Sequence, residues 1–133
     1  MTGDGSDIDV VREIYAAMAA RDLARLVELI DESCVITQDA ALPWGGRHVG
    51  HDGFATFGAT LTGTIDSVVT TEAMFAAEDD VFQVGRTRGT VVATGAPFDI
   101  PEVHRWTIRH GRAVAAHFAI DTAAMLAALA AEG

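Results

Sequence analysis

The chain has 133 residues, half of them hydrophobic, and a formal net charge of −10 with an isoelectric point near 4.6. This length fits one domain, and the hydrophobic share is enough to fill one core and line a pocket as well. The negative charge repels phosphate backbones and no Lys/Arg cluster offsets it, so nucleic acid and anionic membranes are poor candidates as partners.

Cys34 is the single cysteine, so an intrachain disulfide is impossible. It lies in the apolar run 34–36, where a buried and unreactive thiol is expected. No segment has the pattern of a signal peptide or the length of a membrane span, and the cytoplasm is therefore the expected compartment.

Residues 1–6 are polar and Gly-rich and are expected to be flexible, which leaves 7–133 as one domain. A first helix is predicted from Ser6 or Asp7, because apolar residues then recur at helical spacing. Asp22 is predicted to cap a second helix, and the short link 20–22 folds the two into a hairpin. The expected buried face of the second helix consists of Leu23, Leu26, Val27 and Ile30.

Residues 34–38 predict a short strand and 39–50 a loop, after which a third helix opens at 50–53. The segments 64–77, 81–94 and 98–109 are rich in Val, Thr, Ile and Phe and predict long antiparallel strands. His110 and Gly111 indicate a tight turn, 112–120 is the returning strand, and a short tail helix follows. Helices followed by strands predict an α+β fold with the helices on one face of a bent sheet.

Four stretches, in chain order, carry a likeness to a known family: 15–17 with 21–23, then 43–53, 104–111 and 120–122. With them the chain resembles the SnoaL-like polyketide cyclase branch of the nuclear transport factor 2-like superfamily, which includes ketosteroid isomerase. The resemblance implies a cone-shaped, cystatin-like fold in which a curved antiparallel sheet wraps the N-terminal helices. It does not fix the reaction, because this fold hosts several unrelated chemistries.

The isomerase residues themselves are missing. Counted from Asp22, the tyrosine position of ketosteroid isomerase falls on Ile14, one residue before Tyr15, and its base position falls on Gln38. Its second aspartate falls near His104. The Arg-x-Asp strand motif of limonene epoxide hydrolase, a relative in the same superfamily, does not occur in the chain.

His104, Tyr15 and Asp121 are the candidate catalytic residues. In the strand interpretation His104 shares a face with Trp106, where an imidazole can act as acid or base, or can be purely structural. Tyr15 either packs in the core or donates its hydroxyl proton to a substrate. Asp121 either caps the tail helix or, as the resemblance to cyclases that use an Asp with a His implies, faces the cavity rim.

The register of the last hairpin decides which residues join His104. A two-residue turn puts His117 and Asp121 on its face, whereas an extra residue or a bulge puts Phe118 and Ile120 there, which the resemblance favours. The expected ligand pocket comprises Gln38, Asp39, Trp44, Phe57, Trp106, Phe118 and Ile120.

These residues predict a small-molecule pocket for an apolar polycyclic or terpenoid-like substrate, with cofactor-free proton transfer as the chemistry: isomerisation, cyclisation or dehydration. The alternative is a non-catalytic module that binds a ligand or a protein. No cofactor is implied, and His48 and His51, three residues apart at a loop and a helix start, are not expected to hold a metal.

A homodimer is expected through the open face of the sheet, whose alternate residues include Val103, Thr107 and Val114. The alternative is a monomer in which the tail helix, 121–131, covers that face.

Overall fold

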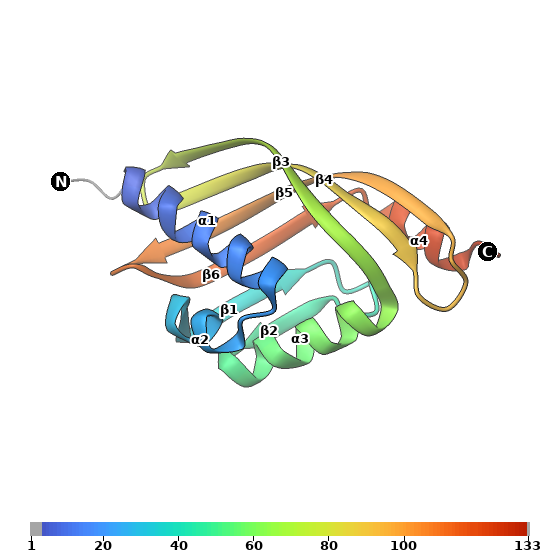
Figure 1. The fold of residues 1–133 in the computed structure, drawn as a ribbon, viewed down its shortest axis with the longest axis horizontal. Helices are drawn as coiled ribbons and strands as arrows, with labels where there is room; N and C mark the ends of the chain where they lie inside the picture. Colours follow the sequence, from blue (N-terminus) through green and yellow to red (C-terminus); the bar gives the residue numbers. More distant parts are fainter. Residues whose placement is uncertain (1–3, 133) are drawn as a thin grey trace.

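The computed structural model describes residues 4–132. The elements in chain order are α1 (Asp4–Ala20), α2 (Leu23–Leu29), β1 (Ile30–Gln38), β2 (Gly46–Val49), α3 (Gly50–Thr64), β3 (Ile65–Ala77), β4 (Asp80–Val91), β5 (Pro97–Arg109), β6 (Arg112–Ile120) and α4 (Thr122–Ala130). Figure 1 shows a strongly bent sheet with α1 lying across it, so the predicted α+β class is confirmed. Helix α1 begins inside the segment 1–6 that was expected to be flexible, and residues 1–3 lie outside the described residues.

The six strands form one sheet in the order β2-β1-β6-β5-β4-β3. Strands β3 to β6 make the predicted antiparallel meander. The sheet is not antiparallel throughout, because β1 enters beside β6 and pairs with it in parallel. Strand β2 lies inside the segment expected to be a loop and pairs antiparallel with β1.

The second helix is shorter than its apolar pattern suggested. Asp22 caps it as predicted, with its carboxylate accepting a hydrogen bond from the Arg25 backbone N–H. Leu26 is buried, but Leu23 and Val27 are exposed, so the expected buried face is only partly correct. The physical reason is that the helix ends after about two turns, where Ile30 begins β1. Within 4–132 no helix combines the length and apolarity needed to cross a membrane.

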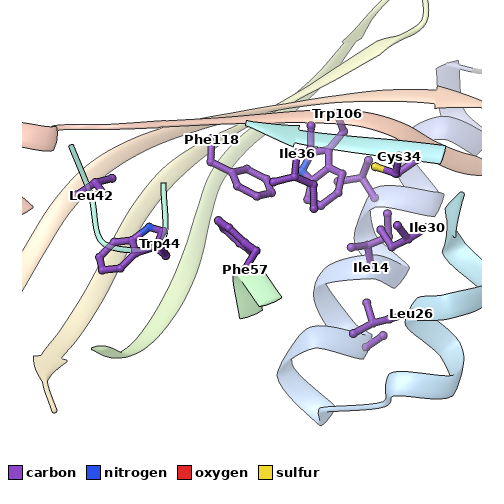
Figure 2. Packing of buried hydrophobic residues seen from close by; sticks show 14 of the residues in the cluster. Ile14, Leu26, Ile30, Cys34, Ile36, Leu42, Trp44, Phe57, Trp106 and Phe118 are labelled. Carbon is purple, nitrogen blue, oxygen red and sulfur yellow. The ribbon is translucent and has the colours of Figure 1, made fainter. Parts of the chain in front are cut away.

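The hydrophobic core fills the space between the bent sheet and the helices. Figure 2 shows Phe118 and Trp106 extending from the sheet towards Phe57 of α3, with Trp44 beyond them. Phe57 and Phe118 have ring centroids 5.5 Å apart. Cys34 is buried in this core, as predicted, and burial raises the pKa of its thiol to about 12.

The β5–β6 hairpin combines both features that the sequence left open. His110 and Gly111 form a two-residue turn, with φ angles of 52° and 75°, between the paired residues Arg109 and Arg112. A register shift between Thr107 and Ile108 then adds a bulge. The bulge places Phe118 opposite His104 and so selects the apolar alternative.

Gly85 offers a test of the close packing between β3 and β4. A Cβ atom there would lie 1.9 Å from the Thr70 carbonyl oxygen and 3.0 Å from Glu102 Oε1. We expect Gly85→Ala to lower the free energy of unfolding by about 2 kcal/mol or more, since the backbone has to move.

Gly58→Ala in α3 is the matched control. Apart from its chain neighbours and the backbone of its own helix, no atom of the described residues lies within 4 Å of its added Cβ, so alanine should stabilise this helix position by about 0.5–1 kcal/mol. Urea denaturation of both variants gives the measurement. Wild-type stability in Gly85→Ala would contradict the close approach of the strands.

Candidate active site

A cavity of about 70 Å³ lies between the sheet and the helices. Tyr15 from α1 and His104 from β5 supply polar groups to its wall, and Met125 from α4 closes one side. Six of the seven residues expected in the ligand pocket line it: Gln38, Trp44, Phe57, Trp106, Phe118 and Ile120. The site is therefore a small apolar chamber with a few polar groups on its wall.

Tyr15 and His104 meet across the cavity wall. The Tyr15 hydroxyl lies 2.6 Å from His104 Nδ1, and Trp106 Nε1 donates a hydrogen bond to the same hydroxyl at 3.0 Å. Helical spacing turns Tyr15 toward the sheet, and strand alternation puts His104 and Trp106 on one face of β5, as predicted. Phe118 packs edge-on against His104, with ring centroids 4.7 Å apart.

Behind His104 lies a buried carboxyl group. Glu102 Oε2 is 3.1 Å from His104 Nε2, and the Glu102 side chain is fully buried. The contact lacks the alignment of a hydrogen bond, and neither carboxyl oxygen has a well-aligned partner among residues 4–132. Gln83 stands opposite His104 on β4, where its amide nitrogen donates to Thr71 Oγ1 at 2.9 Å.

Burial controls the protonation of this cluster. Burial raises the pKa of Glu102 to about 7; the Gln83 amide opposes that shift and the charge of Glu72 adds to it. Burial lowers the pKa of His104 to about 3 and raises that of Tyr15 above its usual value. At neutral pH the imidazole and the phenol are therefore both uncharged, and Glu102 is the group of the three that is close to its titration point.

The two loop carboxylates expected near the cavity lie outside it. Asp39 is exposed, and its carboxylate accepts a hydrogen bond from the Ala41 backbone N–H. Asp121 is exposed at the N-cap of α4, where it accepts from Ala124 N–H at 3.0 Å. Both side chains satisfy their own local backbone, which is the common behaviour of Asp at turns and helix starts.

Sequence reasoning missed Glu102 and Gln83. The signal was present, because both residues fall in the strand alternation that buries their neighbours, at positions 100, 104 and 106 on β5 and 81 and 87 on β4. A charged residue in phase with a buried face indicates a special environment. The carboxylate beside His104 thus comes from two residues earlier on the same strand.

Gln38 occupies the wall position where the isomerase base was expected to fall. Its side-chain oxygen accepts a hydrogen bond from Trp44 Nε1 at 2.9 Å. His48 and His51 each direct Nε2 to backbone carbonyl oxygens. Over the described part of the chain no cluster of three His, Cys, Asp or Glu side chains is arranged to hold a metal ion.

The SnoaL-like domain family model matches residues 11–116, and the chain therefore belongs to the SnoaL-like family. No curated protein matches the chain.

Solved structures agree in fold. An NTF2-like protein of unknown function from Burkholderia pseudomallei is 26% identical, with a TM-score of 0.86 over 94% of this chain and 98% of that one. Wild-type IdmH from Streptomyces antibioticus, a candidate polyketide cyclase, is 26% identical, with a TM-score of 0.73 over 94% and 99%. TerC, co-crystallised with polyporic acid, is 21% identical, with a TM-score of 0.86 over 94% and 98%, and shows the fold alone.

The buried carboxyl predicts a pH-dependent stability. Only the folded state resists ionisation of Glu102, so wild-type stability falls as pH rises from 4.5 through about 7. Glu102→Gln carries no such cost. The free energy of unfolding of the variant should therefore rise relative to that of wild type over this pH range. A pKa shift from 4.5 to about 7 corresponds to about 3 kcal/mol in total.

Urea denaturation at several pH values measures the difference. Glu32→Gln, at an exposed position of β1, is the control for loss of a carboxylate as such. A stability difference independent of pH would contradict a raised pKa for Glu102.

Proposed function

We propose that this protein is a cofactor-independent acid/base enzyme that acts on a small, mostly apolar molecule. The observation that carries the proposal is the hydrogen bond between Tyr15 and His104 on the wall of an apolar cavity. A neutral imidazole and a neutral phenol in this position can exchange protons with a carbonyl or hydroxyl of a bound substrate. Isomerisation, aldol-type cyclisation and dehydration all need such an exchange.

The positions of Tyr15, His104 and Gln38 in the site suggest a different chemical role for each. Tyr15 is suited to donate a hydrogen bond where negative charge develops, because burial keeps it protonated. His104 is suited to resupply that proton to Tyr15 through Nδ1, because burial keeps the imidazole neutral. Gln38 can orient a substrate through its amide but cannot serve as a base, which separates this site from the steroid isomerase pattern.

The size of the cavity restricts the substrate. About 70 Å³ is well below the roughly 300 Å³ or more of a typical ligand pocket. A polycyclic or terpenoid-like substrate therefore requires the chamber to open, and α4 is the element to move, since Met125 is buried in the cavity wall and much of the helix surface is exposed. The co-crystal of TerC with polyporic acid is compatible with an aromatic ligand in this fold.

The closed state of the same cavity favours a second candidate, a non-catalytic ligand-binding or protein-interaction module. A binding module needs the apolar wall but not the Tyr15–His104 pair. The two functions therefore differ in what removal of the polar pair does.

The test starts from a substrate found by screening small polyketides, steroids and terpenoids. His104→Ala and Tyr15→Phe are each expected to lower kcat by about 10²- to 10⁴-fold, the usual contribution of a general acid or base. Ligand affinity should change much less. Thr37→Ala, on the opposite face of the sheet beside His117, is the control. Unchanged turnover in His104→Ala would remove His104 from the mechanism, whereas compounds that bind without being turned over would favour the binding module.

We also propose that the chain forms a homodimer through the outer face of the sheet. Val103 is 40% exposed and Phe75 is 51% exposed on that face, and Phe75 stacks on Phe82. Helix α4 leaves this face free, because its Met125 packs into the cavity on the inner side. Apolar side chains in this arrangement favour a twofold contact between two copies.

Light scattering at micromolar concentration tests the dimer, with a mass of twice 14.0 kDa as the expected result. Val103→Glu places a charge on the face and should shift the protein toward monomer. A monomer mass for the wild type that does not change on concentration would contradict the proposal.

A further inference from the structure

Four side chains form a continuous chain of polar contacts from the cavity wall into the sheet. Trp106 Nε1 donates to the Tyr15 hydroxyl, that hydroxyl lies 2.6 Å from His104 Nδ1, and His104 Nε2 lies 3.1 Å from Glu102 Oε2. Each ring nitrogen of His104 therefore has one polar neighbour, and the Glu102 carboxyl has to turn to align with Nε2 before it donates or accepts there. A neutral imidazole carries one proton, so one of its two nitrogens donates and the other accepts.

Two proton arrangements satisfy these contacts. In the first, Tyr15 donates to Nδ1 and the ring proton sits on Nε2, facing Glu102, which has to accept. In the second, Nδ1 donates to the Tyr15 oxygen and the bare Nε2 needs a donor. A carboxylate can only accept and so fits the first arrangement alone, whereas a carboxylic acid can supply the donor that the second arrangement needs.

The two arrangements differ in what Tyr15 offers to the cavity. The Trp106 indole only donates, so the Tyr15 oxygen accepts from it in both cases. In the first arrangement the single hydroxyl proton is used on His104. In the second it is free, and Tyr15 lines the cavity, where that proton can reach an acceptor on a ligand.

We propose that Glu102 is a positioning residue that sets the direction of the Tyr15–His104 hydrogen bond. Protonated Glu102 donates to His104 Nε2 and leaves Tyr15 as a donor to a carbonyl or other acceptor in the cavity. Ionised Glu102 accepts from Nε2 and turns the Tyr15 proton away from the ligand. The site then selects ligands that carry a hydrogen-bond acceptor, and does so best when Glu102 is protonated. The catalytic consequence rests on the proposed function, whereas the switch itself does not.

The surroundings of Glu102 place this change near neutral pH. Burial raises its pKa to about 7, with Glu72 on β3 adding to the shift and the Gln83 amide on β4 opposing it. Tyr15 faces it from α1 and His104 from β5, both uncharged at that pH. Ile120 is its partner on β6 and carries no charge. Proton binding at Glu102 therefore controls the arrangement without competition from its neighbours.

Nitrogen-15 NMR of the histidine ring tests the switch directly, because the two ring nitrogens have different shifts when protonated and when bare. The spectra are recorded from about pH 5 to about pH 9, two units on either side of the Glu102 pKa of about 7. The His104 signals are assigned by their loss in His104→Asn. We expect the proton on Nδ1 at the acid end and on Nε2 at the alkaline end.

Two variants sharpen the result. Glu102→Gln cannot ionise, so one tautomer should persist over the whole range. Glu72→Gln removes the neighbouring exposed charge and should keep the transition but move its midpoint to lower pH. A wild-type His104 that keeps one tautomer throughout overturns the proposal. That result is expected if protonated Glu102 donates instead to Gln83 Oε1, which has no hydrogen-bond partner within residues 4–132. A transition that survives in Glu102→Gln overturns it too.

The measurement needs no substrate. A protein that turns over no screened compound can still show the tautomer change, in which case the proposed function fails and the switch stands. An active protein whose His104 tautomer ignores pH refutes the switch alone.

Discussion

The contact between Tyr15 and His104 joins two parts of the chain that are 89 residues apart and fixes how the helical layer sits on the sheet. It is made at the centre of an otherwise apolar interface, where a polar group without a partner is costly. A shift or rotation of helix α1 on the sheet would therefore leave His104 Nδ1 buried without its hydrogen-bond partner. The same contact puts two proton-carrying groups on the cavity wall, so structural and chemical demands coincide at one position.

Glu102, next to His104, is the residue of this cluster whose burial is energetically unfavourable. A fully buried carboxyl without a well-aligned partner destabilises the fold when it ionises, and such strain is common at functional sites. Gly85 makes room for it, because any side chain at that position would press on the Glu102 oxygen and on β3. The region behind His104 thus contains a glycine and a buried ionisable group. A core with a purely structural role requires neither of them.

Much of the architecture follows from local patterns. The period-two alternation of the late strands and the Asp22 and Asp121 caps are local features that predict the observed elements. The shared face of His104 and Trp106 follows from the same alternation. Two local predictions were wrong because a neighbouring strand determined the structure. Helix α2 ends early, with Val27 exposed, because β1 begins at Ile30. Strand β2 forms where a loop was expected because it pairs with the edge of β1.

The sequence by itself determined which residues alternate into the core, and hence that a histidine and a tryptophan would share a buried face. Only the tertiary structure decided their partners. A bulge at Val114 of β6, opposite Thr107 and Ile108, places Phe118 and not His117 beside His104. The packing of α1 brings Tyr15 to His104 Nδ1. The physical reason is that strand periodicity is a local property, whereas register and the contacts between layers depend on how distant segments fill a common space.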